Sequence, residues 1–414
     1  MNMEHDYKRT ILKQVIEITN DYPITLVTGA RQVGKTTLVE YFKKHCGYNL
    51  VSLDNDELKD EANASPREFL NKYQTPLIID EVQKAESLFS EIVYRVNKAD
   101  SEGKQTNGMF ILTGSARNDL IKHTQESMAG RVGIIEMPPL SQAEIRNWDT
   151  SPFSANNNKL FKKASDRSLS KDDFLKSVLI GFFPKQWKYD KPIKMFYDNY
   201  LTTYIEQDVS QIINIYEKVK FQSFIKYLAS LTAHEYIPDN IAKVIDVSKN
   251  TINSWVSILV AGGIVRLLPP YYETSIHKQI VKRNKIFFND TGLVCHLLKI
   301  DSITALNKSI HKGSIIETYI HNEIWKSYIN NGLNPAMYYY RDYKQKEIDL
   351  IILHDGALDI VECKSGENYG RNDVENFKCL ENTNYDINGR CIICTNDEPQ
   401  NIKSGIYAFP IKCV

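Results

Sequence analysis

The sequence predicts an α/β protein of several domains, and three observations support this prediction. The chain has 414 residues, which is too long for one ordinary hydrophobic core and indicates about two to four domains. Apolar, β-branched runs and helical periodicity mark the first 150 residues, and a second group of such strands begins at Tyr338. The composition, with 42% hydrophobic and 25% charged residues, is that of a soluble globular protein.

The charge balance excludes little, because Lys plus Arg and Asp plus Glu each number 51. Any electrostatic surface for a nucleic acid must therefore be local. The N-terminal residues lack the apolar core of a signal peptide, and no apolar run approaches the length of a membrane span. We therefore expect a cytoplasmic protein with no membrane partner. Cys391 and Cys394 lie in an apolar run, which favours a buried strand over a metal or redox pair.

A phosphate-binding loop (P-loop) lies between a predicted strand, Ile24 to Thr28, and a helical pattern that begins just after Lys35. Two glycines let the backbone curl so that its N–H groups and the new helix's positive end face phosphate oxygens. Lys35 would reach the β and γ phosphates of ATP, and Thr36 would hold Mg²⁺. The candidate loop residues are Gly29, Ala30, Arg31, Gln32, Val33, Gly34, Lys35, Thr36 and Thr37.

Two acids end the next strongly apolar strand, which runs from Pro76 to Glu81. Asp80 can orient Mg²⁺ through water, and Glu81 can polarise the water that attacks the γ-phosphate. Solvated acids at a strand end are the alternative, which the nearby phosphate loop disfavours. A further strand from Gly108 ends in small polar groups, where we choose Ser115 over Thr113 and Asn118 to face the γ-phosphate or the attacking water. A simple polar turn is the alternative for each of the three.

Arg131 precedes another predicted strand, Val132 to Met137, and is the candidate to stabilise γ-phosphate charge. It would act within its own chain or from a neighbouring subunit, and Arg117 is a second candidate. A surface salt bridge is the alternative for both. Further on, Ser141 and Glu144 have the spacing of a helix capping box.

The chain resembles prokaryotic AAA-type ATPases whose C-terminal half is a domain of unknown function. The resemblance rests on Gly29-x4-Gly-Lys-Thr, Leu-Ile-Ile-Asp80-Glu81-Val-Gln, Leu-Thr-Gly-Ser115-Ala and Gly-Arg131-Val with Pro-Leu-Ser-x-x-Glu144. It implies a parallel sheet in which the Asp-Glu strand and the Thr-Gly-Ser strand lie near the phosphate-loop strand. By analogy it also implies a homo-oligomer.

The middle of the chain begins with a polar stretch, Asp149 to Lys171, which favours a linker and a boundary near residue 150. A long amphipathic helix is then expected over 196–213. Its Tyr200, Tyr204 and Asp208 share one face, which we interpret as packing.

Residues 237–270 have the layout of a winged helix-turn-helix. Ser248 would cap its second helix, and Gly262 and Gly263 would end it. The helix would bury Ile252, Trp255, Val256 and Leu259 and expose Lys249, Asn250, Asn253 and Ser254. These exposed residues would meet a DNA major groove, and the basic residues between His277 and Lys285 would follow the backbone. A protein–protein module is the alternative.

In the C-terminal part, Glu317 lies on a predicted helix, Asp349 starts a predicted strand, and Glu362 and Lys364 point to one side of the next strand. This set of residues resembles the core of PD-(D/E)xK nucleases. The resemblance implies that Glu317, Asp349 and Glu362 hold Mg²⁺ or Mn²⁺ and that Lys364 steadies the attacking water. A strand pair with surface acids and a DNA-binding platform without cleavage are the alternatives.

The predicted fold is therefore α/β, with four parts. These are an N-terminal P-loop AAA-type ATPase domain (1–150), a linker and helical segment (151–215), a central winged-helix domain (216–300) and a C-terminal α/β restriction-endonuclease-like domain (301–414). The expected function is Mg²⁺-dependent ATP hydrolysis coupled to a DNA-directed, nucleolytic C-terminal half. Two alternatives are an ATP-driven switch and a winged-helix regulator, neither of which cuts its partner.

Overall fold

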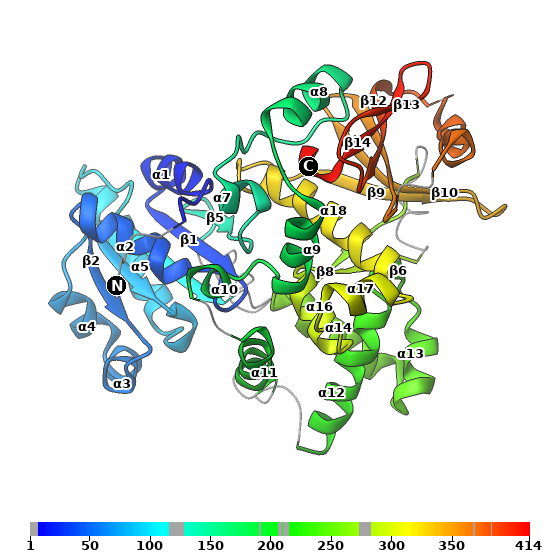
Figure 1. Cartoon of the computed structure of the whole chain (residues 1–414). Coiled ribbons are helices and arrows are strands. Elements are labelled where there is room, and N and C mark those ends of the chain that lie inside the picture. Colours follow the sequence, from blue (N-terminus) through cyan, green and yellow to red (C-terminus); the bar gives the residue numbers. More distant parts are fainter. Residues whose placement is uncertain are drawn as a thin grey trace. The chain divides into compact units, whose positions relative to one another are not determined.

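The computed structural model describes residues 7–115, 128–189, 192–205, 209, 215–272, 283–366, 369–381 and 383–414. Their contacts divide the chain into two compact units (Figure 1). The first unit runs to Leu140 and includes residues 261–263 and 329–332, and the second contains the rest. Among the described residues, no helix is long and apolar enough to cross a membrane.

The first unit is built on a parallel sheet with the strand order β2-β3-β4-β1-β5. Its strands are β1 (Ile24–Gly29), β2 (Asn49–Ser52), β3 (Leu77–Asp80), β4 (Phe110–Ser115) and β5 (Val132–Glu136). Every residue of β1, β3 and β4 is buried, as expected of strands covered by helices on both faces. The helices are α1 (Leu12–Asp21), α2 (Lys35–His45), α3 (Asp56–Ala64), α4 (Pro66–Lys72) and α5 (Leu88–Ser101).

The register of this sheet brings three strand ends to one edge. Gly29 at the end of β1 lies beside Ser115 at the end of β4, and β3, which ends at Asp80, pairs with β4 on its other side. This confirms the parallel sheet and the strand neighbours that the family resemblance implied. The phosphate loop and both polar strand ends therefore lie together at the carboxyl ends of the parallel strands, where ligands bind in such folds.

The second unit begins with short helices. They are α7 (Gln142–Arg146), α8 (Asn157–Asp166), α9 (Lys171–Ile180), α10 (Pro184–Lys188) and α11 (Ile193–Tyr204). Tyr200 and Tyr204 are buried, and the Tyr200 ring lies 4.7 Å from that of Phe183, so their predicted packing role is confirmed. Helix α11 ends at Tyr204, and Asp208 lies outside the described residues.

The middle of this unit contains α12 (Ile215–Ser230), α13 (Pro238–Ile245), α14 (Lys249–Ala261) and a small sheet with the order β6-β8-β7. The strands are β6 (His234–Glu235), β7 (Val265–Leu268) and β8 (Lys285–Phe288), all antiparallel. The four predicted apolar residues of α14 are buried, and Ser248 accepts a hydrogen bond from the backbone N–H of Thr251. After α14, Gly263 has a φ of 68°, a left-handed conformation that suits glycine.

The C-terminal part is a six-stranded sheet of described residues with the order β13-β14-β12-β11-β10-β9. Strands β9 (Ala336–Arg341), β10 (Glu347–His354) and β11 (Ala357–Cys363) are antiparallel, and β12 (Asp386–Cys394) and β14 (Ile406–Pro410) continue in parallel from β11. Strand β13 (Gln400–Lys403) lies at one edge of this sheet and β9 at the other. The remaining helices are α16 (Thr291–Leu297), α17 (Ile303–Lys308), α18 (Lys312–Ile329) and the 3₁₀ segment η3 (Arg371–Leu380). Cys391 and Cys394 are buried in β12, as predicted.

Candidate functional site

The loop after β1 has the backbone that phosphate binding requires. Gly29 has a φ of 150°, and a Cβ there would lie 2.3 Å from the carbonyl oxygen of Met137. Gly34 has a φ of 100° and directly precedes α2, so the first N–H groups of this helix open onto the loop. The two glycines singled out in the sequence therefore occupy conformations that side chains would strain.

Lys35 is the first residue of α2 and is buried, with 6% of its surface exposed. Its Nζ donates hydrogen bonds to the backbone oxygens of Gly29 and Ala30, each at 3.0 Å. The ammonium group therefore lies inside the curve of the loop, where it can exchange carbonyl partners for phosphate oxygens.

Asp80 makes the largest group of side-chain hydrogen bonds among the described residues at the carboxyl ends of the strands. It is 2% exposed and accepts hydrogen bonds from three hydroxyls, those of Thr36 (3.1 Å to Oδ2), Ser52 (3.4 Å) and Thr113. Thr36 and Asp80 are thus in direct contact although 44 residues separate them. A hydroxyl and a carboxylate at this separation are hard oxygen donors of the kind that Mg²⁺ prefers.

Glu81 follows Asp80 in the left-handed conformation, with a φ of 58°. Its N–H donates to the Thr113 hydroxyl at 3.2 Å, and its carboxylate accepts a hydrogen bond from Gln83. Gln83 also donates to the hydroxyl of Ser115 at 3.2 Å. The side chains of Glu81 and Ser115 are therefore linked through Gln83, and Thr113, which ranked below Ser115 in the sequence, contacts both acids.

Arg131 lies at the amino ends of the parallel strands, whereas the phosphate loop lies at their carboxyl ends. Its backbone oxygen accepts a hydrogen bond from the N–H of Ile24, the first residue of β1, whereas Gly29 is the last. A strand of six residues spans about 17 Å. The guanidinium bonds Asn97 at 2.6 Å and the backbone of Ala129. The suggested role within its own chain is therefore corrected, and action from a neighbouring subunit stays a prediction. Arg117 and Asn118 lie outside the described residues.

A second group of charged residues lies in the C-terminal part. Residues 350 and 361 pair across β10 and β11, and one further step of the same antiparallel register places Asp349 opposite Glu362, with both side chains on one face. Asp349 accepts a hydrogen bond from the N–H of Cys363 at 2.8 Å. Lys364 bonds Glu362 at 2.9 Å and Asp373 at 2.9 Å. Asp349, Glu362 and Lys364 are therefore brought together as predicted.

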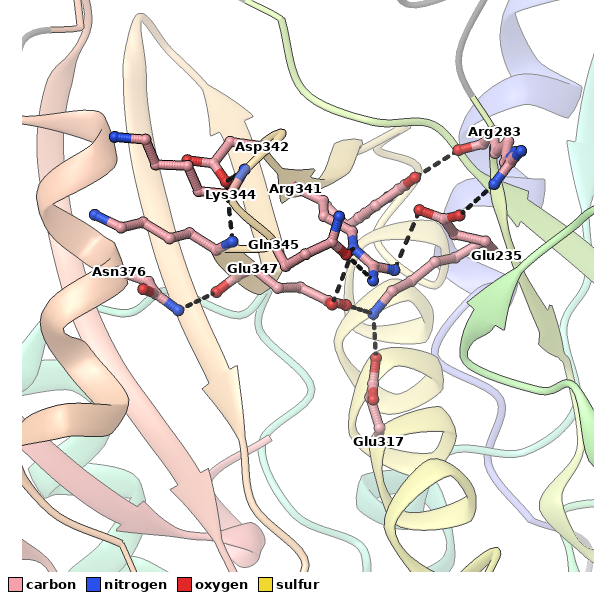
Figure 2. A network of polar contacts seen from close by, with 12 residues as sticks. Glu235, Arg283, Glu317, Arg341, Asp342, Lys344, Gln345, Glu347 and Asn376 are labelled. Carbon is pink, nitrogen blue, oxygen red and sulfur yellow. Dashed lines mark hydrogen bonds and ion pairs between the residues drawn. The ribbon is translucent and has the colours of Figure 1, made fainter.

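Glu317 has a partner that the sequence did not indicate. Figure 2 shows the network around it, in which the buried Lys285 ammonium lies 3.0 Å from Glu317 and 2.5 Å from Glu347. Arg341 joins Glu347 at 3.9 Å and Glu235 at 3.3 Å. The predicted placement of Lys285 along a DNA backbone is therefore wrong, because this side chain is only 4% exposed.

Burial, and then neighbouring carboxylates, raise the pKa of Glu317, Asp349 and Glu362. Burial, followed by the charge of Asp349, raises the pKa of Glu362 well above its usual range. Burial also raises the pKa of Asp349 and that of Glu317, and the ammonium of Lys285 opposes both rises. Burial alone would lower the pKa of Lys285, but Glu317, Asp349 and Glu347 outweigh it and raise that pKa. The cluster thus favours cations strongly.

The three predicted metal ligands do not form one shell. In the described part of the chain, no group of three or more His, Cys, Asp or Glu side chains is arranged to hold a metal ion. The physical reason is that Lys285 engages Glu317. The donor set of Asp349 and Glu362 still fits a divalent cation, because the buried Oε2 of Glu362 has no hydrogen-bond partner.

Comparisons with known proteins assign the first part of the chain. Residues 21–146 match the model of an AAA domain. This region is therefore similar to AAA ATPase domains. Residues 171–304 match a domain of unknown function (DUF8612), and residues 312–414 match another (DUF4143).

Two mycobacterial proteins are similar over most of the chain. The uncharacterized protein Rv2008c of Mycobacterium tuberculosis and the uncharacterized protein Mb2031c of Mycobacterium bovis are each 26% identical over 330 residues, which is 80% of this chain and 67% of theirs.

Among solved structures, the Walker-type ATPase paby2304 of Pyrococcus abyssi has a TM-score of 0.42 and 14% identity, covering 72% of this chain and 97% of that one. Cdc6p of Pyrobaculum aerophilum has a TM-score of 0.28 and 14% identity, covering 64% and 90%. Since both scores are low, the AAA-type assignment depends on the family model and on the sheet and loop geometry.

Proposed function

We propose that this protein is a Mg²⁺-dependent ATPase whose nucleotide cycle governs a DNA-directed C-terminal half. The contact between Thr36 and Asp80 at the mouth of the phosphate loop carries the first part of the proposal. This contact places two oxygen donors beside a helix N-terminus and a lysine at the carboxyl ends of the strands, and these are the groups that a P-loop ATPase uses to bind nucleotide and Mg²⁺.

Each residue has a distinct task in this proposal. The loop amides from Gly29 to Thr37 bind the phosphates, and Lys35 moves from the loop carbonyls to the β and γ phosphate oxygens. Thr36 and Asp80 hold and orient Mg²⁺, which supplies charge neutralisation on the phosphates. Glu81 accepts a proton from the attacking water, and Gln83 and Ser115 keep that carboxylate in place.

The test of the nucleotide site is ATP turnover by the purified full chain with Mg²⁺. We expect Lys35→Ala to lower turnover by about 100-fold or more, because it removes the cation that meets the phosphates. Lys43→Ala on the exposed side of the same helix is the matched control and should turn over ATP normally. Unchanged hydrolysis in Lys35→Ala would refute the site.

DNA is the proposed partner of the second unit. Helices α12 to α14 with the three-stranded sheet β6-β8-β7 support a winged-helix arrangement. Lys249, Asn250, Asn253 and Ser254 are exposed on α14, as a groove-reading helix requires. Two of them have intramolecular partners, since Lys249 bonds Asp239 and Asn253 bonds Tyr236.

The order of α18, β9, β10, β11, η3 and β12 supports a restriction-endonuclease-like core, in which an acid pair and a lysine face one side of a mixed sheet. We propose that Asp349 and Glu362 hold a divalent cation there and that Lys364 steadies the water that attacks a phosphodiester. A switch that binds DNA or protein without cleavage is the second candidate, favoured by the ion pairs that already engage Lys364.

Plasmid DNA with Mn²⁺ separates the two candidates. Nicking that disappears in Asp349→Ala and in Lys364→Ala, but persists in the exposed-site control Lys344→Ala, supports cleavage. Intact plasmid together with a salt-sensitive complex that survives Asp349→Ala supports the switch or regulator.

A further inference from the structure

The charged cluster of the C-terminal part has two sections. Four carboxylates (Glu317, Glu347, Asp349 and Glu362) lie near two ammonium groups (Lys285 and Lys364). The acids therefore exceed the lysines, and a further cation can be accommodated only where a carboxylate oxygen is still available.

Lys285 fixes the first section. Its strand, β8, is held from both sides, because Lys285 pairs with Glu235 of β6 and with Leu268 of β7. Its ammonium contacts the Oε1 atoms of both Glu317 and Glu347. Only 4% of the Lys285 side chain is exposed, so little of this ammonium group is solvated by bulk water.

The second section has an available oxygen. Glu362 offers Oε1 to Lys364, whereas its buried Oε2 has no hydrogen-bond partner. Asp349 lies opposite Glu362 on the same face of β10 and β11. A buried carboxylate oxygen without a partner is costly, and a divalent cation shared with Asp349 would satisfy it.

We infer that Lys285 withholds Glu317 and Glu347 from divalent cations, so that Asp349 and Glu362 are the carboxylates that hold the ion. This inference rests on the metal site of the proposed function and assigns Lys285 as its positioning residue. Glu317, which nuclease-like cores offer as a ligand, is instead the counter-ion of a permanent internal cation.

The first test is calorimetric titration of Mn²⁺ into the full chain without nucleotide. Asp349→Asn should remove one binding event, which identifies the site. Glu317→Gln keeps the shape of the side chain and should change the dissociation constant of that event by less than about 3-fold, since Glu317 is not a ligand. A weakening of about 10-fold or more would overturn the inference, because loss of a directly bound carboxylate removes a full negative charge from the ion's own shell.

The second test releases Glu317. Lys285→Met leaves the buried Glu317 without its partner, so Mn²⁺ should bind about 10-fold more tightly or better, because Glu317 becomes available as a further carboxylate ligand. Adding Glu317→Gln to Lys285→Met should return the affinity toward the wild-type value. A purely structural role of Lys285 would not produce this return, and Lys344→Met is the control for loss of an exposed lysine. Weaker or unchanged binding in Lys285→Met contradicts the inference.

The proposed metal site and the inference about Lys285 can fail separately. If the wild-type chain binds no Mn²⁺ at the Asp349 site, the proposed metal site fails. The assignment of Asp349 and Glu362 then fails with it, and the withholding role of Lys285 stands only if Lys285→Met gains an Mn²⁺ site that Glu317→Gln removes. Normal Mn²⁺ binding with a large loss in Glu317→Gln leaves the proposed function intact and refutes the inference alone.

Discussion

At the residue scale, the nucleotide site is a set of short polar contacts between segments far apart in sequence. Lys35, Thr36 and Asp80 were predicted from their motifs, because loop and strand-end chemistry demands those residue types. Ser52 and Gln83 were not, and Thr113 was ranked below Ser115, since hydroxyls and amides at strand ends usually serve simple turns. The structure shows that Asp80 accepts hydrogen bonds from Ser52 and Thr113, whereas Gln83 joins Glu81 to Ser115.

Glu81→Gln should separate nucleotide binding from hydrolysis. The amide keeps the size of the side chain but cannot accept the proton of the attacking water, so turnover should fall by about 100-fold or more. The dissociation constant of ATP should change by less than about 3-fold, because Glu81 follows β3 and is not one of the residues proposed to bind the phosphates. Fluorescence titration with a nucleotide analogue and a phosphate-release assay measure the two quantities.

The control is Glu86→Gln, which alters an exposed acid five residues away. Equal loss of turnover in both variants, or full turnover in Glu81→Gln, would remove Glu81 from its proposed role.

Lys285 shows why the C-terminal cluster could not be predicted fully. In sequence it closes a basic run, and such runs usually form a solvated face. The structure buries it because β8 is the central strand of its small sheet, which directs Lys285 at Glu317, 32 residues away. No local pattern encodes such a pairing.

At the scale of single elements, capping was more predictable than extent. The capping box of α7 is present, with the Ser141 hydroxyl accepting from the N–H of Glu144 at 3.1 Å and the Ser141 N–H donating to the Glu144 carboxylate at 2.9 Å. Both contacts are local, so four residues of sequence suffice to predict them.

Ser141→Ala should lower the free energy of unfolding by about 1 kcal/mol, the usual cost of losing an N-cap. Chemical denaturation followed by circular dichroism measures this change. The exposed Ser168→Ala serves as control and should have no measurable effect. Equal stability of Ser141→Ala and the wild type would show that the cap contributes nothing here.

Helix α8 carries a lysine whose charge destabilises the fold. Burial, and then the adjacent Arg167, lower the pKa of Lys163 to about 8. An unfolded lysine keeps its proton to about pH 10.4, so the unfolded chain binds more protons between these values and stability should rise with pH from about 8 to 10. Below pH 8 the full cost of the buried charge is present.

Lys163→Met should therefore stabilise the protein by about 1–2 kcal/mol at pH 7, and the gain should shrink as pH rises toward 10. Thermal unfolding at several pH values provides the measurement. Lys162→Met, on an exposed neighbour, should give no such pH-dependent gain. A gain that is constant with pH would mean that lost charge is not its cause.

At the scale of the whole molecule, the alternation of strands and helices sufficed to predict an α/β chain with a nucleotide-binding first part. The family resemblance implied only that the Asp-Glu and Thr-Gly-Ser strands lie near the phosphate-loop strand. The full order β2-β3-β4-β1-β5 was not predicted, because periodicity does not specify which strands are neighbours. For the same reason, the position of Arg131 at the amino ends of the strands was not evident before the register of β1 and β5 was known.

Coupling between nucleotide and DNA is the prediction at this scale. If ATP governs the second unit, a non-hydrolysable ATP analogue must change the affinity for duplex DNA, and DNA must change the affinity for the analogue by the same factor, about 5- to 150-fold. Fluorescence anisotropy and calorimetry measure the two arms. Lys35→Ala should remove the effect, and Lys249→Ala should weaken DNA binding without affecting ATP binding.

Identical affinities with and without the second ligand would show that the two units work independently, even if each binds its own partner.

The fold-back of Lys35 onto the carbonyls of Gly29 and Ala30 has a consequence for the resting protein. An arriving triphosphate meets a loop already shaped around a positive charge, so little ordering entropy is lost on entry. The triphosphate must, however, displace two backbone carbonyl oxygens that already accept hydrogen bonds from the Lys35 ammonium. Nucleotides with fewer phosphates offer this lysine fewer oxygens in return, so the loop itself ranks ATP above ADP and AMP before any chemistry begins.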